Sequence, residues 1–190
     1  MIINLKKMGG SSVLAGSSNG KKTLARLLAA IVQEPLDAEV LFLDFANIEV
    51  ATASYLRESV LVLRNLVRSR RSNFYPVVAN ANVEVKDELV ELVSGQKSDV
   101  LLACRVTESG KVSDIQLIGD LEPIQRKTLD HVRLLGETDA GELMRAHGAK
   151  DRTTRTTAWN NRLTSLSSLG LLVEVSQGRT KKYRPLFEGI

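Results

Sequence analysis

The chain has 190 residues, of which 43% are hydrophobic and 25% charged, and its formal net charge is +4. This size and balance are typical of one or two soluble globular domains, and no apolar run is long enough to span a membrane. The single cysteine, Cys104, excludes an internal disulfide, and residues 1–10 lack the pattern of a signal peptide. We therefore expect a cytoplasmic protein that does not contact membranes.

Catalytic and metal-binding chemistry find little support in the sequence. Only two histidines are present, His131 and His147, and neither has a metal-ligating partner at a useful spacing. We expect both at the surface or at helix ends. Asp44 follows an apolar run without a recognisable base or metal ligand, and Cys104 has the surroundings of a buried strand thiol. We thus expect no enzyme activity, no metal and no cofactor.

Residues 1–120 alternate between helix-like and strand-like runs. The expected helices cover 23–32, 54–68 and 85–93, and the expected strands cover 40–45, 74–78, 99–105 and 112–118. In the run 54–68, apolar residues recur at helical spacing: Leu56, Val60, Leu63 and Val67. The alternation favours an α/β or α+β sheet domain, which we place at residues 1–120.

The segment 16–23 has some features of a nucleotide-binding P-loop. In that motif four residues separate the two glycines, and Ser or Thr follows the lysine directly. Here only three residues separate Gly16 from Gly20, and Lys22 stands in the hydroxyl position after Lys21. We therefore expect no NTPase activity. Free amides at a helix start and an ordinary capped turn both fit this segment.

The stretch 43–56 joins an apolar strand, a loop and a helix that begins near a small hydroxyl residue. This arrangement resembles the core motif of STAS-like domains, a family that includes the anti-sigma-factor antagonists. The resemblance implies a module for protein interaction or sensing. In the antagonists the serine at the helix start is phosphorylated by a partner kinase, and Ser54 matches that serine. Thr52 stands where those proteins usually have aspartate, and Tyr55 where they have glycine. Ser54 is thus a candidate phosphorylation site, with an ordinary helix cap as the alternative.

Residues 121–190 follow a different pattern. Pro123 suits the first turn of a helix over 123–135, and Thr138 suits the cap of a second helix that stops at Gly148. A third helix is expected to begin between Asp151 and Thr156. Two short strands follow, over 171–175 and 183–186, with a basic turn between them. The residues expected to face the core are Ile124, Leu129, Val132, Leu135, Leu143, Met144, Ala146, Trp159, Leu163, Leu166 and Leu169.

Positive charge is concentrated in this C-terminal part of the chain. Residues 150–190 carry eight Lys or Arg and three Asp or Glu, whereas the remainder is nearly neutral. Three helices followed by a basic hairpin resemble a winged helix-turn-helix domain. The resemblance implies that the third helix and the hairpin contact double-stranded DNA.

The candidate DNA-binding residues lie around the third helix and in the basic turn. They are Arg152, Thr153, Thr154, Arg155, Thr156, Asn160, Asn161, Arg179, Lys181 and Lys182. A helix face that is only solvated is the alternative. Threonine and asparagine are poor helix formers but can hydrogen-bond bases or phosphates, so a contact surface is favoured.

The sequence therefore predicts an α/β (α+β) STAS-like sheet domain at 1–120 and a winged helix domain at 121–190. The first hypothesis is a DNA-binding transcriptional regulator, expected as a homodimer, whose STAS-like half dimerises, senses a signal or binds a protein partner. The alternative is a non-catalytic adaptor in a partner-switching system, controlled by a kinase-like ATPase. Phosphorylation of Ser54 would favour the second hypothesis.

Overall fold

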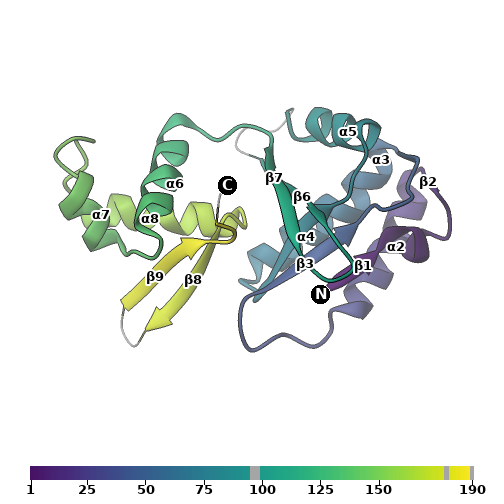
Figure 1. Cartoon of the computed structure of the whole chain (residues 1–190), viewed down its shortest axis with the longest axis horizontal. Helices are drawn as coiled ribbons and strands as arrows, with labels where there is room; N and C mark the ends of the chain where they lie inside the picture. The colour runs from purple at the N-terminus through teal and green to yellow at the C-terminus, as the bar shows by residue number, and fades with distance from the viewer. Residues whose placement is uncertain (95–98, 178–179, 189–190) are drawn as a thin grey trace. The chain divides into compact units, whose positions relative to one another are not determined.

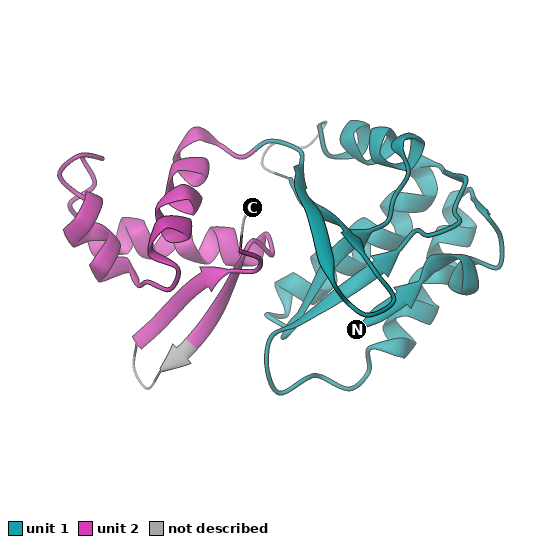
Figure 2. Cartoon of the chain, viewed as in Figure 1, with its two compact units in different colours: residues 1–120 teal, residues 121–190 magenta. Residues whose placement is uncertain are grey.

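The computed structural model describes residues 1–94, 99–177 and 180–188 of a mixed α/β protein. The chain divides into two compact units, Met1–Asp120 and Leu121–Ile190, shown in different colours in Figure 2. We call them the first and the second unit and describe each by itself. Among the described residues, no helix is long and apolar enough to cross a lipid bilayer.

The first unit is built on a mixed five-stranded sheet with the order β1-β3-β5-β6-β7 (Figure 1). Its strands are β1 (Ile2–Asn4), β3 (Glu39–Asp44), β5 (Phe74–Ala79), β6 (Leu101–Val106) and β7 (Val112–Ile118). Neighbouring strands from β1 to β6 are parallel, and β7 is antiparallel to β6. A separate short parallel pair joins β2 (Val13–Leu14) to β4 (Val50–Ala51).

The helices of the first unit connect these strands. They are α1 (Leu5–Gly9), α2 (Ser17–Ala30), α3 (Ala53–Leu56), the π-helical turn η1 (Arg57–Leu61), α4 (Val62–Ser69) and α5 (Val83–Ser94). The connections between parallel strands all advance in one direction across the sheet, so right-handed crossovers place these helices on one face. The alternate residues Leu41 and Leu43 of β3 accordingly share one core with the helices.

The expected helix over 54–68 is confirmed as the continuous segment α3-η1-α4. Its four apolar positions at helical spacing are all buried: Leu56, Val60, Leu63 and Val67. Helix α2 packs closely against this segment at Gly20. A Cβ atom at Gly20 would lie 2.7 Å from the backbone oxygen of Tyr55, so the contact requires glycine.

The second unit consists of three helices followed by a two-stranded antiparallel sheet. The elements are α6 (Pro123–Leu135), α7 (Ala140–His147), α8 (Thr156–Ser168), β8 (Leu172–Gln177) and β9 (Thr180–Pro185). Thr138, which lies between α6 and α7, forms an isolated antiparallel bridge with Tyr183 of β9. Trp159 and Tyr183 are the largest side chains of its core, and both are fully buried.

For some residues of the second unit, the prediction that they face the core is wrong. Ile124 and Leu135 are 45% and 46% exposed, and Ala146 is also exposed. The buried face of α6 instead carries the polar residues Gln125, Thr128 and His131. Each of these finds a hydrogen-bond partner inside the unit, which removes most of the cost of burying it.

The cap of α7 is also one residue away from its expected place. Asp139 caps the helix, since its carboxylate accepts hydrogen bonds from the backbone N–H groups of Gly141 and Glu142. Thr138 is fully buried because its backbone pairs with Tyr183 in both directions. Thr138, which the local pattern predicted as the helix cap, therefore pairs with a strand instead.

Candidate nucleic-acid interface

Helix α8 is buried along one side and polar along the other. Trp159, Leu163 and Leu166 face the core with no exposed surface, and Leu169 is half-buried. The exposed residues of the helix are Thr156, Thr157, Asn160, Asn161 and Ser168. Hydroxyl and amide groups of this kind can donate to and accept from bases or phosphates.

The segment that leads into α8 is divided between exposed and structural residues. Arg152, Thr154 and Arg155 are exposed, and Arg152 has a positive φ of 50°. Thr153 is half-buried, and its carbonyl oxygen accepts a hydrogen bond of 2.9 Å from Trp159 Nε1. Its hydroxyl accepts a second bond of 2.9 Å from the Arg162 guanidinium, which stacks 4.8 Å from the Trp159 ring centroid. Thr153 therefore holds the segment on the core.

The two described lysines of the hairpin lie on opposite faces, because side chains alternate along a strand. Lys181 forms an ion pair of 2.6 Å with Glu174, whose other carboxylate oxygen accepts from the Tyr183 hydroxyl. That hydroxyl lies 3.3 Å from Thr164 Oγ1, so Lys181 is on the side of the hairpin that meets α8. Lys182 is on the other side and pairs with Glu137 at 3.5 Å.

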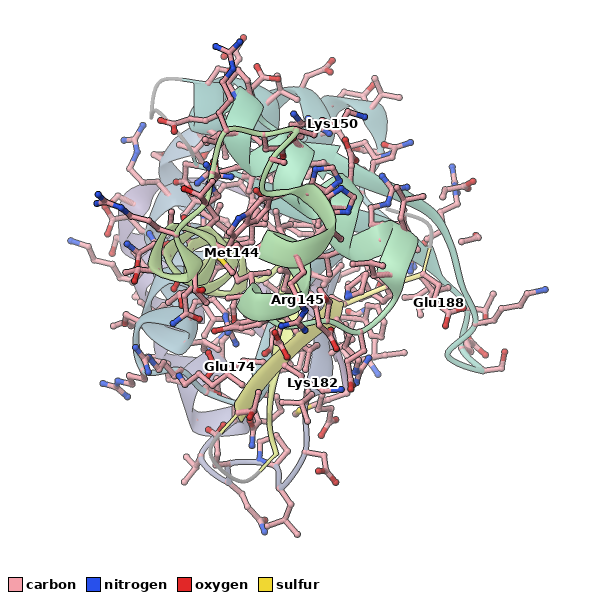
Figure 3. The ribbon with its side chains drawn as sticks, turned by 90° about the vertical axis from the view of Figure 1, so that its left-hand side faces the viewer. Met144, Arg145, Lys150, Glu174, Lys182 and Glu188 are labelled. Atoms are coloured by element: carbon pink, nitrogen blue, oxygen red, sulfur yellow. The ribbon has the colours of Figure 1, made fainter. Side chains whose placement is uncertain are left out.

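Lys181 and Lys182 thus do not form one cationic cluster. Figure 3 labels Glu174 and Lys182 on the hairpin, together with Arg145 on α7. Arg179, the remaining cation predicted in the turn, lies outside the described residues.

A buried charged cluster fastens the α7–α8 connection to α6. The carboxylate of Asp151, only 5% exposed, lies 2.5 Å from Lys127 Nζ and 3.0 Å from His131 Nε2. The His131 ring stacks on His147, with centroids 3.6 Å apart. Burial by itself raises the pKa of Asp151, but hydrogen bonds from Lys127 and His131 outweigh it and hold that pKa below its usual value.

The sequence does not reveal this cluster, because its pattern predicts both histidines at the surface or at helix ends. His131 is in fact buried, while His147 is half-buried at the end of α7. No spacing signal could have revealed the cluster, because its members come from α6, α7 and the connection between α7 and α8. Its position immediately before Arg152 makes it the anchor of the exposed residues that precede α8.

In the first unit, Ser54 lies in the first turn of α3 and is half-buried. Its Oγ is 3.1 Å from the hydroxyl of Thr52, the residue that caps the helix. The carboxylate of Glu88, from α5, accepts a 2.9 Å hydrogen bond from the backbone N–H of Ala53. A negative group therefore already interacts with the N-terminus of α3.

The glycine-containing segment forms part of a helix. Because α2 begins at Ser17, Gly20 and Lys21 lie within its turns, and the capping residue Gly16 donates its N–H to Thr52 Oγ1 at 3.3 Å. This geometry differs from a loop that encloses phosphates with its backbone.

The two side chains considered for catalysis, Asp44 and Cys104, lie in environments that suit a structural role. The Asp44 carboxylate accepts hydrogen bonds from the side chains of Asn4 and Asn80 and from the N–H of Ala46. Burial raises the pKa of the Cys104 thiol to about 11, which makes its reactive thiolate scarce. Within the described part of the chain, no group of three His, Cys, Asp or Glu residues is arranged to hold a metal ion.

Comparisons of the chain with family models, with curated proteins and with solved structures found no match. Proposals about function therefore depend on the geometry of the two units.

Proposed function

We propose that this protein is a transcriptional regulator that binds double-stranded DNA through a winged helix-turn-helix domain formed by the second unit. The order of elements supports the proposal: α6, the bridging residue Thr138, α7, α8 and the β8-β9 hairpin. The bridge adds a third chain segment to the edge of the hairpin. In this arrangement α8 is the helix that enters the major groove, and the hairpin is the wing.

The observation that carries the proposal is the exposed polar side of α8 next to two exposed arginines. Asn160 and Asn161 have amide groups suited to base edges, and Arg152 and Arg155 have guanidinium groups suited to phosphates. Neither arginine forms an ion pair within the described part of the chain. Lys181, on the side of the hairpin that meets α8, adds a third cation once it is released from Glu174.

The first unit is proposed as a STAS-like module that dimerises, senses a signal or binds a protein partner. A phosphate on Ser54 would favour the partner-switching alternative. Such a phosphate would lie near the Glu88 carboxylate, which already accepts a hydrogen bond from the first turn of α3. Repulsion between these two negative groups supports the DNA-binding proposal over the adaptor.

Binding of the intact chain to a random pool of DNA duplexes, followed by sequencing of the bound fraction, tests this function. We expect an enriched motif and a strong dependence of affinity on salt. Arg152→Gln with Arg155→Gln should weaken binding to every sequence and reduce the salt slope by about two units. Asn160→Ala should instead change the preferred motif.

The matched control is Lys6→Gln with Lys7→Gln, which removes two exposed cations of the first unit. This variant should bind DNA like the unchanged protein. The proposal is wrong if the intact chain retains no duplex at low salt, or if both double variants weaken binding equally.

A further inference from the structure

A pocket of about 570 Å³ lies in the first unit at the C-terminal ends of α2 and α4. This volume is within the range of small-molecule sites. Leu28 of α2, Ile31 directly after α2 and Leu66 of α4 are half-buried and line it, together with the buried Val67 and Phe74. The pocket thus offers an apolar surface to a molecule that enters from solvent.

Hydrogen bonds hold one wall of this pocket in place. The Glu34 carboxylate accepts hydrogen bonds from the Ser72 hydroxyl, at 2.7 and 3.0 Å, and from the backbone N–H of Asn73. The Asn73 side chain in turn donates to the carbonyl oxygens of Pro35 and Leu36, at 2.9 and 3.1 Å. These bonds fasten the loop after α2 to the turn before β5, so the apolar surface has a defined shape.

Two exposed arginines, Arg70 and Arg71, stand on the lining of the pocket. Neither guanidinium forms an ion pair with another residue that the structure describes. The one acidic residue of the lining is Glu34, so two positive charges face one negative charge and the lining carries a net charge of +1. The net charge at the pocket is therefore positive.

The backbone at Arg71 supports a role for its side chain. Its φ of 53° is in the left-handed region, and the Ser72 N–H returns to the Val67 carbonyl to close α4. Glycine is the usual residue at such a helix end, and a side chain there costs about 1 kcal/mol. Strain of this kind tends to occur at functional sites.

From these observations we infer that the first unit binds a small anionic amphiphile in this pocket. Its aliphatic body would pack on Leu28, Ile31 and Leu66, and its carboxylate or phosphate would meet Arg70 and Arg71. The inference goes beyond the proposed function and does not depend on DNA binding, because the pocket lies wholly within the first unit.

Calorimetric titration of the intact chain with decanoate, decanol, decyl phosphate and decylammonium tests the site. We expect one decanoate per chain and an affinity about tenfold higher than that of decanol, since the arginines add charge-assisted hydrogen bonds. Decylammonium should bind more weakly than decanol. The ratio of decyl phosphate to decanoate affinity then shows which anionic group the site prefers.

Three variants distinguish this site from general attraction of anions to a basic protein. Arg70→Gln with Arg71→Gln should abolish the preference for decanoate over decanol while decanol still binds. Arg71→Gly should weaken decanoate binding yet raise the thermal midpoint of unfolding, because glycine accepts the positive φ. Lys6→Gln with Lys7→Gln, the matched control, should change neither.

Absence of one-to-one decanoate binding would overturn the inference. So would an unchanged decanoate preference in the double arginine variant, or an equal loss in the lysine control. Because none of these measurements involves DNA, a failure here leaves the proposal of DNA binding untouched.

Discussion

Asp151 joins the α7–α8 connection to α6 through one carboxylate. It receives Lys127 and His131 from α6, and it directly precedes Arg152, the first of the exposed residues before α8. Once this carboxylate is protonated, its electrostatic attraction to both of these partners is lost. Protonation should therefore loosen the α7–α8 connection before it affects the apolar core.

The pKa shifts in this cluster predict that the second unit loses stability as the pH falls. Burial lowers the pKa of His147, and the neighbouring His131 lowers it further, so the unfolded chain takes up that proton more readily from just below neutrality. The lowered pKa of Asp151 stabilises the fold above the usual carboxyl pKa of about 4, and that stabilisation disappears as the pH falls through the folded value.

Urea midpoints of the intact chain, followed by Trp159 fluorescence from pH 7 to pH 3, measure this dependence. Asp151→Asn should be less stable at pH 7 and should flatten the decline below pH 5. Asp130→Asn, which changes an exposed carboxylate on α6, is the control and should retain the decline. An Asp151→Asn profile parallel to that of the unchanged protein would show that the carboxylate does not anchor the connection.

At the scale of elements, the hairpin carries its described lysines in ion pairs on opposite faces. Exposed ion pairs of this kind contribute little stability, typically below about 1 kcal/mol. A DNA phosphate can therefore compete with Glu174 for Lys181. Because the ion pair with Glu174 must be broken first, Lys181 contributes less to DNA affinity than a free lysine would. The acid thus weakens the contribution of the hairpin to binding.

Glu174→Gln should consequently raise DNA affinity about two- to fivefold at moderate salt, because it frees Lys181 and removes a negative charge beside α8. Glu137→Gln is the matched control: it makes the same change of charge but frees Lys182 on the other face of the hairpin. Fluorescence anisotropy with one labelled duplex measures both. Equal gains in the two variants would contradict the assignment of the α8 side as the contact face.

At the scale of the whole molecule, the chain contains two units with separate cores. The first unit closes its core around the five-stranded sheet, and the second around Trp159 and Tyr183. Domains with their own cores can in principle fold alone. The division between Asp120 and Leu121 therefore predicts two independently folding fragments.

Fragments 1–120 and 121–190 should each give the dispersed amide NMR spectrum of a folded domain. The first fragment should retain decanoate binding, and the second should retain DNA binding with lower affinity if the intact regulator is a dimer. A collapsed or featureless spectrum of either fragment would show that the units depend on each other for folding.

Local periodicity was enough to predict much of the secondary structure. The spacing of Leu56, Val60, Leu63 and Val67 predicted a helix with its buried face, and the apolar run at 40–45 predicted the buried strand β3. Trp159 was also correctly assigned to the core. These features follow from hydrophobicity at a fixed helical or strand period, which a short stretch of sequence contains in full.

Tertiary structure alone decided which polar residues are buried and which charges are neutralised. His131 and Gln125 displace Ile124 and Leu135 from the core because Asp151 and Ser165, distant in sequence, supply their hydrogen bonds. Glu174 and Glu137 likewise neutralise Lys181 and Lys182, and the pocket beside Arg70 and Arg71 forms only when α2 and α4 end side by side. The periodic pattern of apolar residues is contained in a short stretch of sequence. The hydrogen bonds of a buried polar group, however, depend on partners that are distant in sequence and that only the folded chain brings within reach.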